Sequence, residues 1–354
     1  MRRKIPFVAA SLLALAVAYV TCGGGKKNSG DATAKTVYVA GQSNDRATLW
    51  KDSAPQQLST TGNYSWATSV FVSGSDVYVG GLVINRFSWD ADIILPTIWM
   101  NGVSQQLSTT GNYSFVNSVF VNDSDVYVAG DEGFVEVEPY HDFRAVLWTN
   151  GVRQLLGTSK HSSASSVYVA GKDVYVAGQE DDDAVLWKNG IRQELSISSA
   201  ATRSYAFSVY VSGSDVYVAG AETFETLNND GSYSLEGHAV LWTNGARQQL
   251  SSNNNSTGPS ANSVFVSGKD VYVAGWDGNA VLWKNGTRQQ LSNATVAEGS
   301  TEANSVYVSG TDVYVAGLEY KFPYDIGSVR CVLWKNGVRQ SLGVANHVNS
   351  VFVK

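Results

Sequence analysis

One pattern of four short segments recurs along the chain, and it constrains the fold more than any other feature. A full copy holds "SVYV" or "SVFV", then "VYVAG" or a close variant, then "LW" or "IW", then a closing leucine. The marker residues are Tyr38, Trp50 and Leu58; Tyr78, Trp99 and Leu107; Tyr127, Trp148 and Leu156; Tyr175, Trp187 and Leu195; Tyr217, Trp242 and Leu250; Tyr272, Trp283 and Leu291; and Tyr314, Trp334 and Leu342. Seven repeats rich in Val, Tyr and Trp favour a repetitive all-β architecture.

The spacing between these markers separates rigid hairpins from variable loops. The aromatic residue of "SVYV" always precedes the tyrosine of "DVYV" by seven residues, and tryptophan always precedes leucine by eight. Both connections carry turn residues, Gly and Asp in the first and mostly Asn-Gly in the second. The distance from tyrosine to tryptophan varies from 11 to 25 residues. Each repeat is therefore predicted to be four antiparallel strands, with two fixed turns on one face and two variable loops on the other.

A four-stranded unit of this kind, repeated seven times, resembles the blade of a β-propeller. The resemblance covers residues 36–353 and is to the architecture of an uncharacterised class of bacterial secreted proteins or lipoproteins, since the motifs of WD40 and kelch repeats are absent. It implies an all-β fold, a seven-bladed β-propeller of four-stranded antiparallel blades around a central channel. The first repeat lacks its "SVYV" strand, and the chain ends on "SVFV". We expect this C-terminal strand to be the inner strand of blade one and to close the ring.

The start of the chain has the features of a secretion signal. A basic beginning is followed by a roughly 14-residue apolar run, which is too short to span a bilayer comfortably. We predict a signal peptide at residues 1–21, a flexible tether at 22–34 and the propeller at 35–354.

Cys22 lies where a bacterial lipoprotein signal places its lipidated cysteine. Tyr19 and Thr21 depart from the residues usual in such a signal, so an ordinary cleaved signal with an incidental cysteine is the alternative. The prediction is a protein of the bacterial cell envelope, either anchored to a membrane by a lipid or secreted.

Charge and cysteine content limit the possible partners. Removing residues 1–21 removes three positive charges and no acids, so the formal net charge falls from −6 to −9, which argues against a nucleic acid partner. The other cysteine, Cys331, occupies a position where other repeats have alanine, and we expect it to be a small buried residue. We also expect a monomer.

Several positions recur in the repeats, and each admits a structural and a functional interpretation. The seven tryptophans are expected in the core, with a ring of stacking platforms as the alternative. Aspartates follow the first turn and are interpreted as turn caps rather than metal ligands; they are Asp76, Asp125, Asp173, Asp215, Asp270 and Asp312. Serines begin the inner strands, where they either form hydrogen bonds with backbone groups at the strand ends or form a binding site for an anion or a metal; they are Ser69, Ser118, Ser166, Ser208, Ser263, Ser305 and Ser350. Arginines of the outer strands are expected to protect an exposed edge; they are Arg153, Arg192, Arg247, Arg288 and Arg339.

The variable face is the expected location of function, because loops vary while the scaffold does not. Four of its loops combine aromatic residues with carboxylates, which suits sugar rings or a protein partner. The candidate ligand-binding residues are Tyr64, Trp66, Trp89, Asp90, Asp92, Tyr113, Phe115, Tyr140, His141, Asp142, Tyr233, Tyr320 and Tyr324. The alternative is that these loops only pack on each other.

Signals for catalysis are weak, and we assign no catalytic residue, metal ligand or cofactor. Four histidines lie in different repeats without ligand spacing. Pairs such as Asp90 with Asp92, or Glu136 with Glu138, could serve glycoside cleavage, but carboxylates on loops are commonly only solvated. The favoured function is a binding module that recognises a glycan or a protein through its variable face. The alternative is a polysaccharide hydrolase or lyase on a propeller scaffold.

Overall fold

The computed structural model describes residues 35–58, 60, 62–86, 92–135, 141–228, 233–253, 258–292, 299–321 and 329–354. These residues form 28 β-strands and no helix. Among them no helix is long and apolar enough to cross a membrane.

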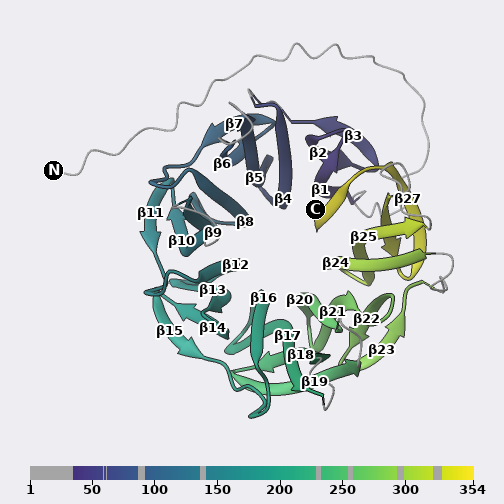
Figure 1. Ribbon diagram of the computed structural model, residues 1–354. Coiled ribbons are helices and arrows are strands. Elements are labelled where there is room, and N and C mark those ends of the chain that lie inside the picture. Colours follow the sequence, from purple (N-terminus) through teal and green to yellow (C-terminus); the bar gives the residue numbers. More distant parts are fainter. Residues whose placement is uncertain are drawn as a thin grey trace, which may run out of the picture. The chain divides into compact units, whose positions relative to one another are not determined.

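The strands of residues 35–354 form a ring of sheets, in which each strand has one of four radial positions (Figure 1). The inner strands are β4 (Tyr64–Ser73), β8 (Tyr113–Asn122), β12 (Ser162–Ala170), β16 (Arg203–Ser212), β20 (Ser260–Ser267), β24 (Gly299–Ser309) and β28 (His347–Val353). The second strands are β1 (Val37–Ser43), β5 (Asp76–Arg86), β9 (Asp125–Val135), β13 (Asp173–Glu180), β17 (Asp215–Leu227), β21 (Asp270–Trp276) and β25 (Asp312–Lys321).

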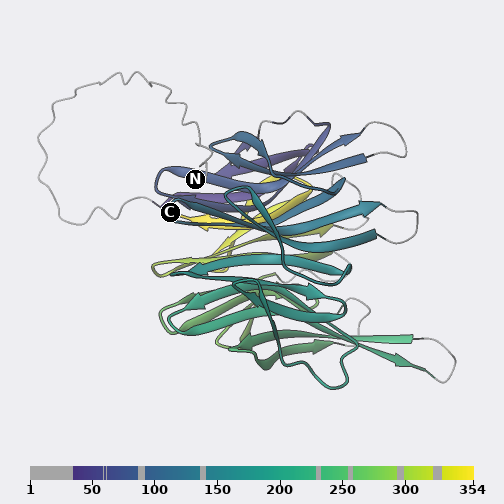
Figure 2. The ribbon, with the colours of Figure 1, turned by 90° about the vertical axis from the view of Figure 1, so that its left-hand side faces the viewer.

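The other two positions lie progressively farther from the axis. The third strands are β2 (Arg46–Lys51), β6 (Asp92–Met100), β10 (His141–Thr149), β14 (Asp183–Lys188), β18 (Tyr233–Thr243), β22 (Ala280–Lys284) and β26 (Arg330–Lys335). The outer strands are β3 (Ala54–Gln57), β7 (Val103–Gln106), β11 (Val152–Leu155), β15 (Ile191–Glu194), β19 (Ala246–Asn253), β23 (Thr287–Gln290) and β27 (Val338–Val344). Figure 2 shows the tight turns at one side of the ring and long hairpins, such as the green β17 and β18, extending at the other.

Hydrogen bonding groups these strands into five four-stranded sheets and one eight-stranded sheet, β4 to β11. An all-β propeller of four-stranded antiparallel blades is thus confirmed, but the expected seven separate four-stranded sheets are not found. In the larger sheet, the third strand β6 and the inner strand β8 are joined by a parallel bridge between Ile94 and Tyr113. This bridge forms because both strands extend into the variable connections far enough to meet.

The C-terminal strand pairs with the first strand of the ring, as the truncated first repeat indicated. β28 runs antiparallel to β1, and Val37 lies opposite Val353. Beyond the strands, the Thr36 and Lys354 backbones exchange two hydrogen bonds of 2.8 and 3.0 Å. The chain ends of the ring are therefore joined to each other.

The core lies between neighbouring sheets. All seven repeat tryptophans are at most 2% exposed, which confirms their interpretation as core residues. One buried cluster, for example, combines Leu186 and Leu195 of one sheet with Val209 and Trp242 of the next. Cys331 is completely buried, as expected, and burial raises the pKa of its thiol to about 12.

Two circles of contacts connect the seven inner strands. Aromatic rings form one circle, with 4.7 to 5.0 Å between consecutive centroids; its members are Phe71, Phe120, Tyr168, Tyr210, Phe265, Tyr307 and Phe352. The inner-strand serines form the other, because each hydroxyl accepts a hydrogen bond of 3.0 to 3.2 Å from a valine N–H of the neighbouring inner strand. The serines therefore satisfy backbone donors between strands.

Aspartates and asparagines connect the two tight turns within a repeat. In six repeats the aspartate after the first turn accepts from the side-chain amide of the Asn-Gly turn, at 2.8 to 3.0 Å. These asparagines have φ between 50° and 53°, which is the left-handed region that Asn tolerates. The aspartates are turn residues, as predicted, although their partner is a side-chain amide rather than a backbone N–H.

Deleting residues 349–354 tests the closure of the ring. Val351 and Val353 are at most 4% exposed, and Phe352 belongs to the aromatic circle. Their loss removes about 1.5–3 kcal/mol for each side chain, together with the hydrogen bonds to β1, from a total stability of about 5–15 kcal/mol. We expect the truncated protein to unfold or aggregate in thermal melting experiments.

The control for this deletion removes residues 23–34, which carry none of the described strands. Its melting temperature should be nearly that of the full-length protein. A C-terminal truncation that melts like the full-length protein would contradict the proposed role of β28.

Candidate functional site

A β-bulge interrupts every inner strand at the same place. The pairing of inner and second strand shifts by one residue there, for example between Ala67 and Ser69 on β4. The glycine that ends "VYVAG" explains why the backbones can approach so closely. A Cβ atom on Gly81 would lie 2.0 Å from the carbonyl oxygen of Trp66, and in all seven repeats the corresponding distance is 1.9 to 2.1 Å, far shorter than any allowed contact. Only glycine fits this position.

These carbonyl contacts define one residue on each inner strand, on the side of the bulge nearer the variable loops. We call the seven residues the mouth layer; they are Trp66, Phe115, Ser163, Tyr205, Ser260, Glu302 and His347. Each lies opposite a residue of its second strand; in the same order these are Leu82, Asp131, Gln179, Ala221, Trp276, Leu318 and Gln42. Trp66 is 37% exposed and the other six are half-buried.

The residues at the bulges themselves link neighbouring inner strands. The Thr68 hydroxyl donates to the Val116 carbonyl at 2.7 Å, and the Asn349 amide donates to the Ala67 carbonyl at 2.9 Å. Asn117, Asn262 and Asn304 make the equivalent bond to the next inner strand. The backbone that carries the mouth layer is therefore held from both sides.

Aromatic contacts stabilise side chains of the mouth layer. The rings of Trp66 and His347 are 5.3 Å apart between centroids, with 49° between their planes. Across the ring, Tyr205 on β16 stacks on Phe207 at 5.9 Å and 12°. Phe115 contacts Phe143 of β10 at 5.7 Å. Three separate aromatic surfaces thus lie at one level of the inner strands.

Two carboxyl groups accompany these rings. Burial raises the pKa of Asp131 to about 6, although its carboxylate accepts from the Ala164 N–H and the Asn117 amide. Burial also raises the pKa of Glu302 and lowers that of His347, because it disfavours the charged form of each group. The aromatic rings of the mouth layer are therefore accompanied by two acids that are partly shielded from water, Glu302 within the layer and Asp131 opposite Phe115.

A second set of acids, which the sequence analysis did not identify, is structural. Five repeats carry an acid two residues after the "VYVAG" glycine, and in each it pairs with the outer-strand arginine; the pairs are Glu132–Arg153, Glu180–Arg192, Glu222–Arg247, Asp277–Arg288 and Glu319–Arg339. The arginines therefore lie on the outer edge of each sheet, as expected, and their guanidinium groups also extend toward the second strand to pair with these acids. The first two repeats have neither the acid nor the arginine. Because each repeat has both residues or neither, their pairing could have been predicted from the sequence.

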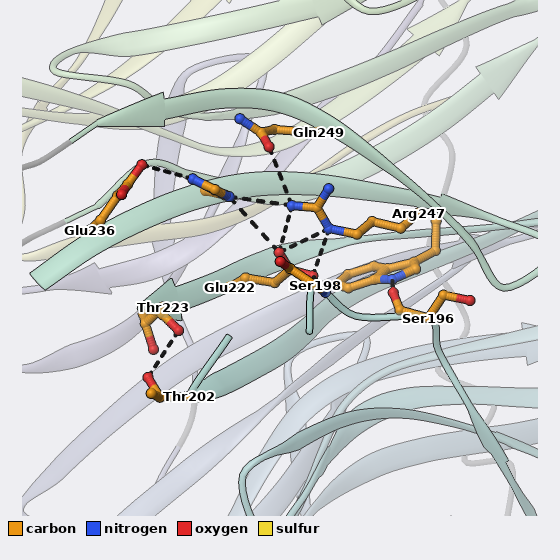
Figure 3. Close-up of polar contacts among 10 residues, drawn as sticks. Ser196, Ser198, Thr202, Glu222, Thr223, Glu236, Arg247 and Gln249 are labelled. Carbon is orange, nitrogen blue, oxygen red and sulfur yellow. Dashed lines mark hydrogen bonds and ion pairs between the residues drawn. The ribbon is translucent and has the colours of Figure 1, made fainter. Parts of the chain in front are cut away.

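Glu222 shows the geometry of these pairs (Figure 3). Its buried carboxylate accepts from the Arg247 guanidinium at 2.6 to 2.9 Å and from the Ser198 N–H at 3.0 Å. Glu132 likewise accepts from the Thr110 N–H and from Arg153. Burial alone would raise the pKa of Glu132, but these hydrogen bonds lower it below its ordinary value. Glu132 and Glu222 thus fix the variable connections that enter their own repeats.

The predicted ligand-binding residues are distributed over the variable face. Trp66 and Phe115 belong to the mouth layer, and Tyr64 and Tyr113 begin the same inner strands. Asp142 pairs with Lys160 at 2.6 Å, Tyr233 is 67% exposed on the projecting β18, and Tyr320 packs against a core cluster. Only the backbones of Asp92 and His141 are described, and Trp89, Asp90, Tyr140 and Tyr324 lie outside the described residues. The binding roles of all these residues stay predictions.

Comparisons with known proteins extend only to architecture. No protein-family model and no curated protein sequence matches the chain. Among solved structures, the Pyrococcus horikoshii acylaminoacyl peptidase is similar at 12% identity and a TM-score of 0.46 over 88% of this chain and 51% of the peptidase. The chain thus spans about half of that enzyme's length.

Two further structures are similar at the same level. The WD40 β-propeller domain of Doa1 is 17% identical with a TM-score of 0.43, over 79% of this chain and 85% of that domain. An exo-1,5-alpha-L-arabinanase from a bovine ruminal metagenomic library is 10% identical with a TM-score of 0.36, over 81% of this chain and 99% of the enzyme. At such low scores the three likenesses carry no information about function.

The variant Gly317→Ala tests whether the glycine contact maintains the mouth layer. Its Cβ would lie 1.9 Å from the Glu302 carbonyl oxygen and 2.9 Å from the Trp334 ring. Because neither the backbone nor the buried ring can easily move, we expect a loss of at least about 3 kcal/mol in the free energy of unfolding, measured by urea denaturation.

Gly151→Ala is the matched control. Gly151 has a φ of +77° and no heavy atom within 4 Å of the added Cβ, so only the left-handed conformation costs energy, about 1–2 kcal/mol. Equal losses in the two variants would show that the close approach at Gly317 does not limit stability.

Proposed function

We propose that residues 35–354 are a binding module that holds a carbohydrate at the mouth layer. The observation that carries the proposal is the set of aromatic surfaces at one level, above all the Trp66–His347 pair and the Tyr205–Phe207 stack. β4 and β16 lie on opposite sides of the ring in Figure 1. A sugar ring presents apolar C–H faces, which pack on aromatic rings, and hydroxyl groups, which bond polar residues such as Ser163 and Ser260.

Two properties of the mouth layer favour a small ring over the surface of a folded protein. Its side chains are recessed on the inner strands, and all but Trp66 are half-buried rather than exposed. Their backbones are fixed by the bulge and by hydrogen bonds between strands. Such preorganisation reduces the conformational cost of binding and suits a recessed ligand.

The alternative is a hydrolase or lyase for polysaccharides. Glycoside cleavage commonly requires two carboxyl groups about 5–9.5 Å apart. The inner-strand neighbours of Glu302 in the mouth layer are Ser260 and His347, and the inner strands β28 and β4 intervene before the strand pair that carries Asp131. The described residues therefore support binding better than cleavage.

We also propose that the eight-stranded sheet counts as two blades, which makes a seven-bladed propeller. The single bridge between Ile94 and Tyr113 joins two otherwise complete sets of four antiparallel strands. Both circles of inner-strand contacts have seven members and pass through β4 and β8 in the same way as through the other inner strands.

Substitutions in the mouth layer test the binding proposal. Trp66→Ala and Tyr205→Ala should each weaken the affinity for neutral or amino oligosaccharides about tenfold or more, because an aromatic contact contributes about 0.5–1.5 kcal/mol beyond its buried area. Isothermal titration calorimetry with hexamers of glucose, mannose, N-acetylglucosamine and glucosamine measures the effect.

Tyr233→Ala is the control, because Tyr233 is an exposed aromatic residue on β18 outside the mouth layer. The affinity of the Tyr233→Ala variant for the hexamers should equal that of the unsubstituted protein. Loss of binding in Tyr233→Ala with binding retained in Trp66→Ala would move the site to the projecting hairpin, and the absence of binding to all four hexamers would contradict a carbohydrate site.

We further propose that Cys22 is lipidated and anchors the protein in the cell envelope, as the signal-like start of the chain suggests. Cys22→Ala should then move the protein from the membrane fraction to the soluble fraction after expression in a bacterium with a lipoprotein pathway. Cys22→Ser and a variant with an unrelated cleavable signal serve as controls. Equal fractionation of Cys22→Ala and the unsubstituted protein would refute the anchor.

A further inference from the structure

The charge around the mouth layer is of one sign. Among the mouth layer, the second-strand residues opposite it and the residues at the bulges, the acids are Asp131 and Glu302, and none is lysine or arginine. The nearest arginine along an inner strand is Arg203, two residues before Tyr205. It is half exposed, and its guanidinium pairs with Asp182 at 3.3 Å. In the part of the chain that the structure describes, the charged groups at this level are therefore acids, and the nearest arginine of an inner strand is already paired with Asp182.

Glu302 is the unusual member of this set. Within the described part of the chain its carboxyl group makes no hydrogen bond and no ion pair, and it lies opposite Leu318, which is 2% exposed. A carboxylate in such surroundings is costly unless a partner compensates it. The neighbouring inner strand carries His347, whose ring contacts Trp66. An oligomer that lies along these neighbouring inner strands would therefore meet a carboxyl group on β24 and the face of an indole on β4.

We propose that the ligand of the mouth layer is an oligosaccharide with free amino groups, such as a polymer of glucosamine. This inference rests on the proposed carbohydrate site and specifies its ligand. A protonated amine beside Glu302 forms a charge-assisted hydrogen bond, and the face of Trp66 attracts the amine of another sugar unit. The sugar rings themselves pack on Phe115 and Tyr205.

The same charge distribution excludes acidic sugars. A uronate would bring a second negative charge next to Glu302 or Asp131, with no arginine or lysine at this level to pair with it. N-acetylation of an amino sugar removes the cation and adds bulk, so the acetylated oligomer loses the interaction with Glu302. The order of affinity expected is therefore glucosamine oligomer, then N-acetylglucosamine oligomer, then uronate oligomer.

Calorimetric titration near pH 6.5, where amino sugars carry substantial positive charge and Asp131 is mostly ionised because its pKa is about 6, tests this order. We expect the glucosamine hexamer to bind about tenfold or more tightly than the N-acetylglucosamine hexamer. Glu302→Gln should abolish most of this difference between the two hexamers. Raised salt should weaken binding of the glucosamine hexamer alone, because screening acts on the charge interaction.

Asp123→Asn is the matched control, because it removes the same charge at an exposed tight turn on the opposite face. It should leave the tenfold preference intact. Trp66→Ala should weaken binding of both hexamers, since both depend on the aromatic surface.

The possible failures are distinguishable. Equal affinity for the two hexamers, or tighter binding of the acetylated or uronate oligomer, overturns the amino-sugar inference and leaves the carbohydrate site in place. A lysine pentapeptide that competes as strongly as the glucosamine hexamer overturns it as well, because it shows a cation site without recognition of the sugar. Failure of every oligosaccharide to bind overturns both proposals.

Discussion

The contact between the "VYVAG" glycine and an inner-strand carbonyl is the constraint on which the arrangement of the site depends. It permits a one-residue bulge, and the bulge changes which residues share a face of the strand. On β4, Trp66 and Phe71 are five positions apart, and a regular strand with a period of two would place them on opposite faces. With the register shift between Ala67 and Ser69, they lie on the same face. One inner strand therefore contributes both to the aromatic circle and to the mouth layer.

The inner strands depend on each other around the whole ring. Each serine hydroxyl bonds the next strand's backbone, and each ring of the aromatic circle contacts two others, so no inner strand has a free neighbour position. This is why β28 must join the first repeat: without it, Ser305 and Tyr307 of β24 would lose their partners on one side. The geometry of the mouth layer is consequently a property of the closed ring and not of single repeats.

The repeat in the sequence allowed the fold to be predicted in detail, including the four strand positions, the buried tryptophans and the pairing of the last strand with the first. The bridge between Ile94 and Tyr113 could not be predicted, because it depends on how far two strands extend into variable connections. The mouth layer was found only in part. Trp66 and Phe115 were recognised as aromatic residues near loops, whereas Glu302 and His347 were not, since their common level with Trp66 depends on a bulge that alternation of polar and apolar residues does not reveal.

Variation between the repeats separates the scaffold from the site. The glycine that contacts the mouth layer is the same in all seven repeats, and so are the serine and the tryptophan that hold the sheets together. The backbone carbonyls of the seven mouth-layer residues contact that glycine, yet these seven positions hold six different residue types. The surrounding backbone is equivalent in every repeat, so the scaffold itself does not require a particular residue type at these positions. A ligand that lies across the ring has no sevenfold symmetry, and a site for it must place a different side chain at each equivalent position.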